Sequence, residues 1–259
     1  MRGVPRPARV AGVRRVSHSY WWLTIELVEG VLNSSPGQFV MVWIPRVKEV
    51  PMSIAYVEPN RKRFSIFFKV VGRGTRSMSQ LHPGSAITVK GPLGKGILDR
   101  IRGENPLLVG GGTGLAPLIY TYHALASMGR RPVVAWGTPK GSDARAVESF
   151  LRSAMGMDVH VASDDCTYGF CGTAVDLAMR ILKERTPSDV IAAGPKPMLR
   201  SLGKKLLAKG MDPLMLLESE VRCGIGMCGS CVIRGTPYLL CIDGPGFRYS
   251  EVVKHLEDS

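Results

Sequence analysis

The segment Val109-Gly-Gly-Gly-Thr-Gly-Leu-Ala-Pro117 decides how this chain folds. An apolar run at 107–109 precedes it, and residues 115–128 after its turn form a helical pattern that Gly129 is placed to end. A glycine-rich turn between a strand and a helix presents backbone N–H groups and a helix N-terminus, which are the groups that bind phosphate. The segment therefore predicts a strand–turn–helix unit with a nucleotide-type turn.

The same alternation continues along the chain. We expect strands at 133–136, 159–162, 190–193 and 214–217, and helices at 143–155, 174–183 and 197–209. This pattern is typical of a doubly wound parallel sheet, which we place at residues 103–217. A second turn, Ala193-Gly-Pro-Lys-Pro-Met198, also follows a strand, so both turns lie at the carboxyl edge, where ligands bind. Neither turn has the G-x-G-x-x-G pattern, and turns that serve only packing are the alternative.

Residues before this sheet have the pattern of an all-β domain. Leu23, Ile25 and Leu27 alternate with bulky or polar neighbours, and further strands are expected at 39–44, 52–57, 64–71 and 86–90. Turn signals rich in Ser, Pro and Gly separate several of these runs, for example at 34–37 and 82–84. Short strands at this spacing predict a small antiparallel β-barrel, which we place at residues 1–102.

The strongest chemical signal is a group of four cysteines near the end of the chain. Its spacing is Cys223-x4-Cys228-x2-Cys231-x9-Cys241, which is the plant-type arrangement of a [2Fe–2S] cluster. Two irons bridged by sulfides need four soft anionic ligands, and the interleaved glycines let a tight loop bring thiolates around one small core. A zinc site is the alternative, but zinc sites commonly use two separated Cys-x2-4-Cys pairs. We therefore predict a small C-terminal [2Fe–2S] unit at residues 218–259.

The other two cysteines, Cys166 and Cys171, have no further pair beside them. We interpret them as ordinary small residues rather than metal ligands. Four cysteines crowded into one segment also do not resemble the dispersed pattern of a small disulfide-stapled secreted protein.

Composition narrows the function classes further. The chain has 259 residues and a formal net charge of +13, but its Lys and Arg residues are scattered apart from an N-terminal cluster, and no nucleic-acid-binding motif is visible. No run approaches the ~18 apolar residues of a membrane span. His18 and Glu26 interrupt what would be the apolar part of a signal peptide. We therefore expect a cytoplasmic protein that binds neither nucleic acid nor membrane.

Taken together, these motifs resemble the ferredoxin–NADP reductase superfamily, and within it the iron–sulfur electron-transfer subunits of dihydroorotate dehydrogenases. The resemblance covers essentially the whole chain. It is carried by Pro51-Met-Ser-Ile54, Lys69-Val-Val-Gly-Arg-Gly-Thr75, Gly91-Pro-Leu-Gly94, Gly110–Pro117, Gly194-Pro-Lys-Pro-Met198, Cys223–Cys231 and Cys241-Ile-Asp-Gly-Pro-Gly246.

The resemblance implies three cofactors: FAD in the barrel, NAD on the parallel sheet, and the [2Fe–2S] cluster on the four cysteines. It implies that the flavin is bound by Pro51, Met52, Ser53, Ile54, Lys69, Gly72, Gly74 and Thr75, with Ser53 near the reactive N5. It implies that the nicotinamide nucleotide is bound by Gly111, Gly112, Thr113, Gly114, Pro117, Gly194, Pro195 and Met198. No catalytic residue is expected in this chain.

One position departs from the family pattern. The family usually has an Arg directly before the Pro-x-Ser segment, where it pairs with a flavin phosphate, and this chain has Val50 there. Arg46, Lys48 and Arg73 are candidate substitutes for the missing charge. If none of them replaces it, the chain would bind its flavin weakly or would use a shorter flavin such as FMN.

A nicotinamide exchanges two electrons at once, a [2Fe–2S] cluster passes one, and a flavin can do both. The resemblance thus implies a relay between NAD and a dihydroorotate-oxidising, FMN-containing partner, in a hetero-oligomer such as a heterotetramer, in pyrimidine biosynthesis. One alternative is a diaphorase-type subunit of a hydrogenase or of a ferredoxin- or sulfur-linked NAD(P)H reductase. Another is a non-catalytic iron–sulfur redox sensor. The choice between NAD and NADP stays open, although Ser163-Asp164-Asp165 follows a strand end.

Overall fold

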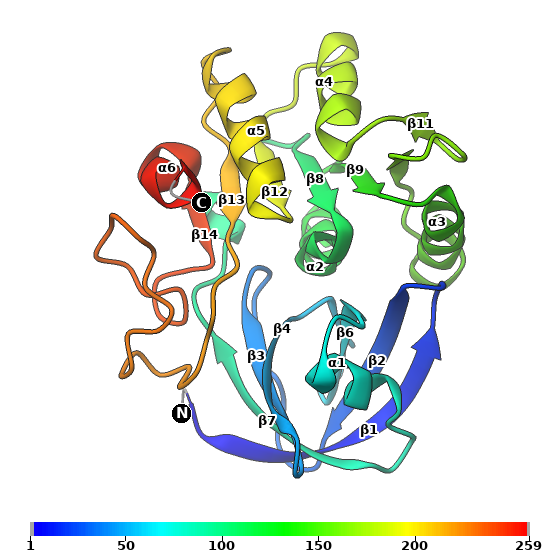
Figure 1. Cartoon of the computed structure of the whole chain (residues 1–259), viewed down its shortest axis with the longest axis vertical. Coiled ribbons are helices and arrows are strands. Elements are labelled where there is room, and N and C mark those ends of the chain that lie inside the picture. Colours follow the sequence, from blue (N-terminus) through cyan, green and yellow to red (C-terminus); the bar gives the residue numbers. More distant parts are fainter. Residues whose placement is uncertain (1–2, 258–259) are drawn as a thin grey trace.

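The computed structural model describes residues 3–257, which form two seven-stranded sheets stacked end to end (Figure 1). The first sheet is antiparallel, in the order β4-β3-β7-β1-β2-β6-β5. Its strands are β1 (Pro5–Arg15), β2 (Tyr20–Leu27), β3 (Phe39–Ile44), β4 (Lys48–Ser53), β5 (Tyr56–Val57), β6 (Arg63–Lys69) and β7 (Ala86–Leu93). This is the flavin-type barrel expected from the sequence.

The sheet curls because its two edge strands are consecutive in the chain. The expected single strand at 52–57 is wrong: β4 pairs with β3, and β5 pairs with β6. Between them, the Ile54 N–H donates to the Gln38 carbonyl at 3.4 Å, and the Ala55 N–H donates to the Ser65 carbonyl at 2.8 Å. The change of partner bends the chain, and it places Ser53 at the mouth of the barrel.

The sequence patterns missed two elements of the barrel. The basic N-terminal segment forms β1, whose Ala8 and Val10 are buried while Arg9 between them is exposed. A short helix, α1 (Arg73–Ser79), follows β6 directly. Leu23, Ile25 and Phe64 are fully buried in the barrel core, as the alternating pattern of their strands requires.

The second sheet is the doubly wound parallel sheet that was expected, in the order β11-β10-β9-β8-β12-β13-β14. Its strands are β8 (Leu107–Gly111), β9 (Val133–Thr138), β10 (His160–Ser163), β11 (Phe170–Cys171), β12 (Val190–Ala193), β13 (Leu214–Leu216) and β14 (Gly246–Arg248). The edge strand β14 differs from the expectation, because it is antiparallel and comes from the C-terminal segment.

Helices cover both faces of this sheet, as Figure 1 shows. The helices that follow its strands are α2 (Leu115–Ser127), α3 (Gly141–Met155), α4 (Ala174–Glu184) and α5 (Lys196–Leu207). Leu108 packs with α2 and α3 residues, whereas Leu107 and Val109 pack with α4 and α5 residues. Successive side chains of a strand point to opposite faces, so β8 contributes to both cores.

The C-terminal segment packs against both sheets. It loops out after β13 and returns as β14 and α6 (Tyr249–Glu257). Its Cys231 and Cys241 are buried in one hydrophobic cluster with Phe39 and Leu93 of the barrel. The three-unit division at 102 and 217 stays a prediction, since β14 of the expected third unit completes the second sheet. Among residues 3–257, no helix is long and apolar enough to cross a membrane.

Candidate functional site

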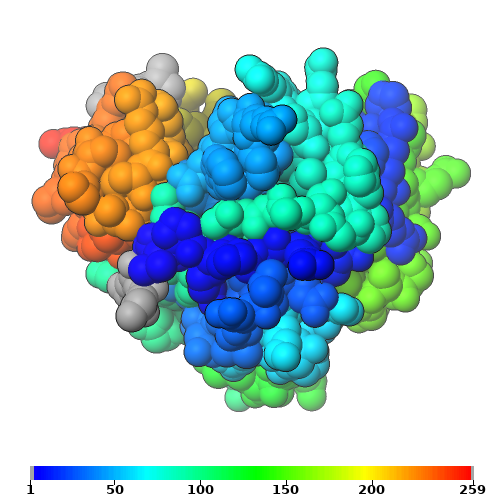
Figure 2. Space-filling model, turned by 90° about the horizontal axis from the view of Figure 1, so that it is seen from below, coloured from blue at the N-terminus to red at the C-terminus, as the bar shows by residue number. Residues whose placement is uncertain are grey.

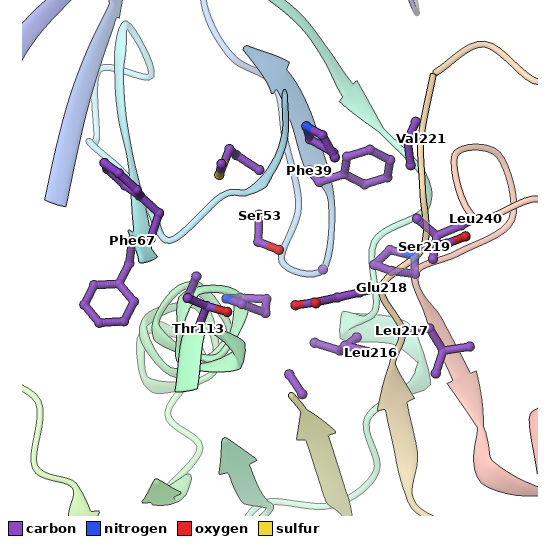
Figure 3. Close-up of a pocket in the computed structure, with 18 of the residues that line it drawn as sticks. Phe39, Ser53, Phe67, Thr113, Leu216, Leu217, Glu218, Ser219, Val221 and Leu240 are labelled. Atoms are coloured by element: carbon purple, nitrogen blue, oxygen red, sulfur yellow. The ribbon is translucent and has the colours of Figure 1, made fainter. Parts of the chain in front are cut away.

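A cavity lies where the barrel, the parallel sheet and the C-terminal segment meet (Figure 3). The barrel lines it with Phe39, Ser53 and Phe67, among others, while Thr113 and Leu216 line it from the second sheet. Its volume of about 250 Å³ is below the ~300–1,000 Å³ of sites that enclose a drug-sized ligand. It can therefore take one planar ring system, and the rest of a dinucleotide would have to lie along the surface.

The C-terminal segment closes the cavity on the side of the cysteines. Glu218, Val221 and Leu240 line it, and Leu240 directly precedes Cys241 in the chain. A ring system in this cavity would therefore lie one layer of side chains from the expected cluster ligands.

Most residues expected to bind the flavin reach this cavity. Its walls include Pro51, Met52, Ser53, Lys69 and Thr75. The others do not line it: Ile54 is fully buried in the barrel core, and Gly72 and Gly74 lie in the turn and first residues of α1.

The turn before α1 is held by one hydroxyl group. The Oγ1 of Thr75 accepts hydrogen bonds from the N–H groups of Val71 and Gly72, at 3.0 and 3.2 Å. Thr75 therefore shapes the turn at which the resemblance places a pyrophosphate.

Gly74 packs closely against Lys48 and Val50 of β4. A Cβ at Gly74 would lie 2.7 Å from Cε of Lys48 and 2.8 Å from Cγ2 of Val50. The helix α1 thus packs directly on β4, and the aliphatic part of Lys48 crosses it. Of the three candidate substitutes for the family arginine, Lys48 contacts this glycine from β4, and Arg73 directly precedes it in the chain.

The two glycine-rich turns of the second sheet touch each other, because β8 and β12 are neighbours. A Cβ at Gly111 would overlap the sulfur of Met198, and one at Gly114 would overlap the Ala193 carbonyl oxygen. Packing against backbone therefore requires a glycine at position 114 regardless of any ligand, whereas the Met198 side chain could shift to admit a side chain at position 111.

Fewer of the expected nucleotide-binding residues are accessible at the carboxyl edge of the second sheet than the sequence indicated. Gly112 and Thr113 are half-buried, with Gly112 at a φ of 54°, and of the eight expected nucleotide residues only Thr113 and Pro117 line the cavity. The Gly112–Thr113 backbone is thus the part of the first turn that a phosphate could reach.

The four cysteines divide into a buried pair and an outer pair. The sulfurs of Cys231 and Cys241 lie 3.3 Å apart in the interior. Cys223 is half-buried and Cys228 exposed, at the surface end of the same loop. A two-iron cluster takes two thiolates on each iron, so a pair-by-pair arrangement suits it better than a cage around one ion.

Backbone conformation supports the same assignment. Gly224, Gly226 and Gly229 all have positive φ, at 70°, 82° and 68°, which side-chain-bearing residues rarely adopt. Within residues 3–257, no three His, Cys, Asp or Glu side chains converge as a ready cage for a single metal ion. The donor set and the glycine loop thus fit the tight thiolate loop of a two-iron cluster.

The thiols differ in how readily they ionise. Hydrogen bonds from Ser230, followed by those from Cys223, lower the pKa of Cys228 to about 6. Burial, followed by the neighbouring Cys231 thiol, raises the pKa of Cys241 to about 12. Iron binds thiolates, so ligation has to remove the proton that burial retains on Cys241.

Glu218 is the functional candidate that the sequence patterns missed. It follows the last residues of the β13 run, and Figure 3 shows its carboxyl group pointing into the cavity. The Glu218 side chain is accessible through the cavity, but protein surrounds its carboxyl group on the other sides. This partial burial disfavours the charged form and raises the pKa of Glu218. A polar residue directly after a strand at the carboxyl edge was the available signal. No comparable sequence signal pointed to the apolar cavity residues Phe39, Phe67 and Leu240.

We predict that Glu218→Gln makes the protein more stable than the wild type above pH 4.5, the ordinary pKa of this group. As the pH rises past that value, the unfolded chain loses its proton while the folded carboxyl retains it, so ionisation favours unfolding. The melting temperature of the variant should exceed that of the wild type by an amount that grows until the pH passes the raised pKa.

The matched control is Glu184→Gln, which removes an exposed carboxylate, 63% accessible, from a surface ion pair with Arg180. Its melting temperature should follow the wild type at every pH. A constant difference between Glu218→Gln and the wild type across pH 5–8 would show that Glu218 does not titrate in this way.

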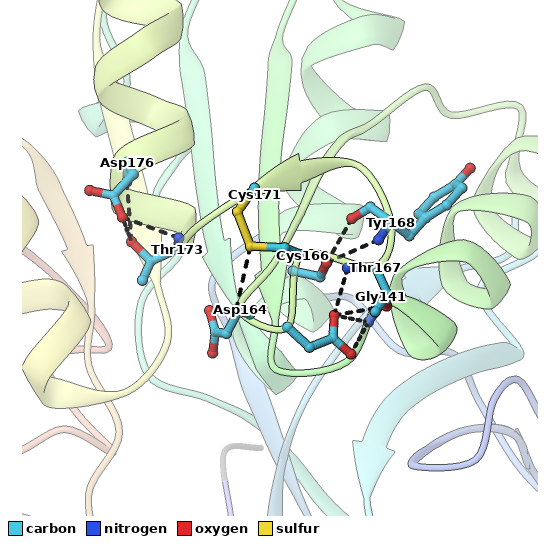
Figure 4. The surroundings of a disulfide bond; sticks show 10 residues. Gly141, Asp164, Cys166, Thr167, Tyr168, Cys171, Thr173 and Asp176 are labelled. Carbon is cyan, nitrogen blue, oxygen red and sulfur yellow. Dashed lines mark hydrogen bonds between the residues drawn. A yellow bond between two sulfur atoms is a disulfide. The ribbon is translucent and has the colours of Figure 1, made fainter.

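The structure corrects the interpretation of Cys166 and Cys171. They are not ordinary unlinked residues but form a disulfide across the loop between β10 and α4 (Figure 4). The loop lies at the carboxyl edge of the sheet, beside Asp164 and Asp165.

The fold and this site define a class: ferredoxin-reductase-like electron-transfer proteins with an added four-cysteine segment. A chain in the structure of an NADH-dependent reduced ferredoxin–NADP oxidoreductase has a similar fold, with a TM-score of 0.80 and 26% identity, over 97% of this chain and 93% of that one. Residues 218–253 match the family model of the iron–sulfur cluster binding domain of dihydroorotate dehydrogenase B.

Two relatives cover nearly the whole chain. The probable dihydroorotate dehydrogenase B (NAD(+)) electron transfer subunit of Pyrococcus furiosus is 31% identical over 252 residues, which are 93% of this chain and 92% of that protein. The corresponding subunit of Bacillus caldolyticus is 34% identical, over 94% of this chain and 96% of that protein. This chain belongs to the family of dihydroorotate dehydrogenase B electron transfer subunits.

Proposed function

We propose that this chain relays electrons between a dihydroorotate-oxidising partner subunit and NAD⁺, through a [2Fe–2S] cluster on its four clustered cysteines and an FAD in its barrel. The partner would carry FMN, and the two subunits would assemble as a heterotetramer. The observation that carries the proposal is the cavity shared by the three parts of the chain. Ser53, Thr113 and Leu240 line one space, each from a different part.

This arrangement suits a change from single electrons to electron pairs. A flavin ring in the cavity would face the nucleotide turn through Thr113 and the cysteine loop through Leu240. When bound, the flavin supplies the chemistry that takes electrons singly and passes them on as a hydride. The chain's own residues hold the ring and exclude water from it, mostly through apolar contacts.

An exposed apolar surface around the outer cysteines is a suitable face for the partner. It consists of four side chains with exposed fractions from 36% to 81%: Ile225, Met227, Val232 and Ile242. Figure 2 shows the cysteine segment beside the start of β1, and Gly3 lies against Ile225. Exposed apolar side chains are typical of protein–protein contact sites, and the exposed Cys228 of the same segment would let an electron cross. That the partner binds here stays a prediction.

A second candidate is the corresponding subunit of a ferredoxin-linked NAD(P)H reductase. The specific observation in its favour is the structural match over 97% of the chain to a protein of that activity. The two functions share the cluster, flavin and nucleotide sites and differ in the partner that delivers electrons.

The deciding experiment is anaerobic co-expression with a dihydroorotate-oxidising subunit, followed by an assay of NAD⁺ reduction. We expect co-purification and dihydroorotate-dependent formation of NADH. If the purified chain reduces dyes with NADH but gives no such activity, and instead couples reduced ferredoxin to NADP⁺, the second candidate is correct. A chain that neither bleaches its flavin with NADH nor reduces dyes would contradict both.

We predict that Lys48→Ala weakens FAD binding roughly tenfold, the effect of losing one hydrogen bond to a charged group. Lys48 crosses Gly74 of α1, close to the turn expected to hold the pyrophosphate, and it supplies the positive charge that Val50 cannot. The measurement is flavin fluorescence on titration of flavin-free protein with FAD.

Arg46→Ala and Arg73→Ala are the matched controls, since each removes one positive charge from the same region. If Lys48 supplies the phosphate-binding charge, both variants should bind FAD within about twofold of the wild type, because each then removes an exposed charge that makes no flavin contact. If either of them, rather than Lys48→Ala, releases the flavin, the assignment of the phosphate-binding charge is wrong.

A further inference from the structure

The Cys166–Cys171 disulfide closes a short loop at the edge where the nucleotide is expected. The chain leaves β10 at Ser163, turns through Asp164 and Asp165, and returns to β11, where Cys171 pairs with Ser163. The bond joins the two sides of this turn (Figure 4). It therefore fixes the segment that follows the third parallel strand.

Both cysteines are exposed, so a reductant can reach the bond directly. Cys166 also has a φ of 57°, which lies in the left-handed region. This backbone conformation costs free energy for any residue that carries a side chain. A residue stays in that region only where its surroundings hold it. Once the bond opens, the backbone at Cys166 is held by the hydrogen bond from its N–H to the Ser163 carbonyl, at 3.2 Å, and it is free to leave the left-handed region.

Those two aspartates face the end of the neighbouring strand. The Asp164 N–H donates to the Thr138 carbonyl at 3.2 Å, and the Asp165 N–H donates to the Pro139 carbonyl at 3.2 Å. The carboxylate of Asp165 accepts the N–H of Gly141, the first residue of α3, at 2.9 Å. The loop thus sets the shape of the edge beyond β9.

This edge continues toward the glycine-rich turn. In the sheet, β9 lies between β10 and β8, so the aspartates are two strands, or roughly 10 Å, from the Gly112–Thr113 backbone. A dinucleotide whose phosphates lie at Gly112 extends that far along the edge. Asp164 is exposed at this edge, within the span of such a dinucleotide.

We infer that Cys166 and Cys171 form a thiol–disulfide exchange site for a dithiol reductant, and that opening it weakens NADH binding. The inference rests on the proposed function, because it needs a nicotinamide nucleotide at this edge. A thiolate of the reductant attacks one sulfur, the Cys166–Cys171 bond breaks, and a mixed disulfide forms. The second thiol of the reductant then releases it. The reductant ends as a disulfide. The two electrons and two protons that it gives up convert Cys166 and Cys171 into free thiols.

The fold outside the loop does not depend on the bond. The Oγ of Ser163 donates to the Tyr168 carbonyl at 2.7 Å, and it accepts from the Tyr168 N–H at 3.3 Å. Past the loop, Thr173 and Asp176 cap the start of α4 through reciprocal hydrogen bonds. Reduction should therefore change the aspartate segment without unfolding the sheet.

The test compares the oxidised holoprotein, the holoprotein after brief treatment with a dithiol, and the Cys166→Ser/Cys171→Ser variant. Alkylation and peptide mapping read the bond directly, because both cysteines fall in the tryptic peptide 153–180, which contains no cluster ligand. Nucleotide binding is read as the KM for NADH in dye reduction. Cluster and flavin absorbance are recorded alongside.

We expect the untreated peptide to resist alkylation and the treated one to accept two labels, with cluster and flavin retained. The KM for NADH should rise about fivefold on reduction, which is a modest coupling between two sites. The double variant should show the raised KM with or without the dithiol.

Free thiols in the untreated protein, or one KM in all three samples, would overturn the inference and leave the proposed function intact. Absence of NADH oxidation in every sample would overturn the proposed function, and the inference with it.

Discussion

Cys223→Ser should abolish partner-driven reduction of NAD⁺ while leaving the flavin in place. Cys223 belongs to the outer pair of cysteines, so its loss removes one thiolate from the cluster without opening the buried Cys231–Cys241 pair. A hydroxyl is a hard, weakly acidic ligand that replaces a thiolate poorly on iron. We expect loss of the cluster's visible absorption and a fall of at least about 100-fold in coupled activity, because losing a ligand should cost more than the ~10–100-fold of losing a residue that only orients one.

The same variant should retain NADH-dependent dye reduction, because hydride transfer to the flavin does not pass through the cluster. Cys171→Ser is the matched control: it also replaces one cysteine by serine, but outside the cluster segment. It should keep the cluster absorption. Full coupled activity in Cys223→Ser would contradict the electron relay through the cluster. Loss of the flavin together with the cluster would show that the cysteine loop has a structural role in the cavity.

The parallel sheet could be predicted from the sequence because its signals are local. Each helix has an apolar face over ten or more residues, and glycines such as Gly129 and Gly156 end two of them. The first barrel strand was missed because only one of its faces is buried. Its outward face carries arginines and prolines, and the buried Ala8 and Val10 are too few to show a period. Helix α1 was missed because it spans only seven residues and begins among glycines.

The candidate site also has parts that could be predicted from the sequence and parts that could not. The four cluster cysteines lie within 19 positions of one another, so their spacing alone predicts their chemistry. The cavity is built by side chains that meet only after folding, such as Phe39, Phe67 and Leu240. The disulfide was missed for a related reason: residues five apart can pair only if the chain reverses between them. That reversal depends on Gly169 and on a left-handed Cys166, which the spacing does not reveal.

One half-buried arginine joins the three parts whose meeting forms the cavity. The guanidinium of Arg248 in β14 donates to both carboxylate oxygens of Asp189, at 2.8 and 2.9 Å. It also donates to the backbone carbonyls of Asp212, before β13, and of Arg100, at the end of the barrel. The Asp189 carboxylate holds the pKa of Arg248 above its ordinary value, and the side chains are only 12% and 6% exposed. A bidentate, desolvated pair of this kind is costly to break from one side.

Arg248→Ala should therefore lower the free energy of unfolding by about 3 kcal/mol, because it leaves the nearly inaccessible Asp189 carboxylate with only the N–H groups of Arg102 and Val190 as partners. For a chain of this size that corresponds to a fall in Tm of roughly 10 °C. The exposed Arg152, which is 64% accessible and pairs with Glu148 and Asp158, is the matched control. Arg152→Ala should cost less than about 1 kcal/mol.

A second variant separates the unpaired charge from the lost packing. Replacing both partners, Arg248→Met with Asp189→Leu, should recover much of the stability, because no buried charge is then left alone. Flavin release on heating should follow the same order, since Pro245 of the segment that Arg248 anchors lines the cavity. If Arg248→Ala has the same Tm as Arg152→Ala and the wild type, the three parts are held together by their apolar contacts alone.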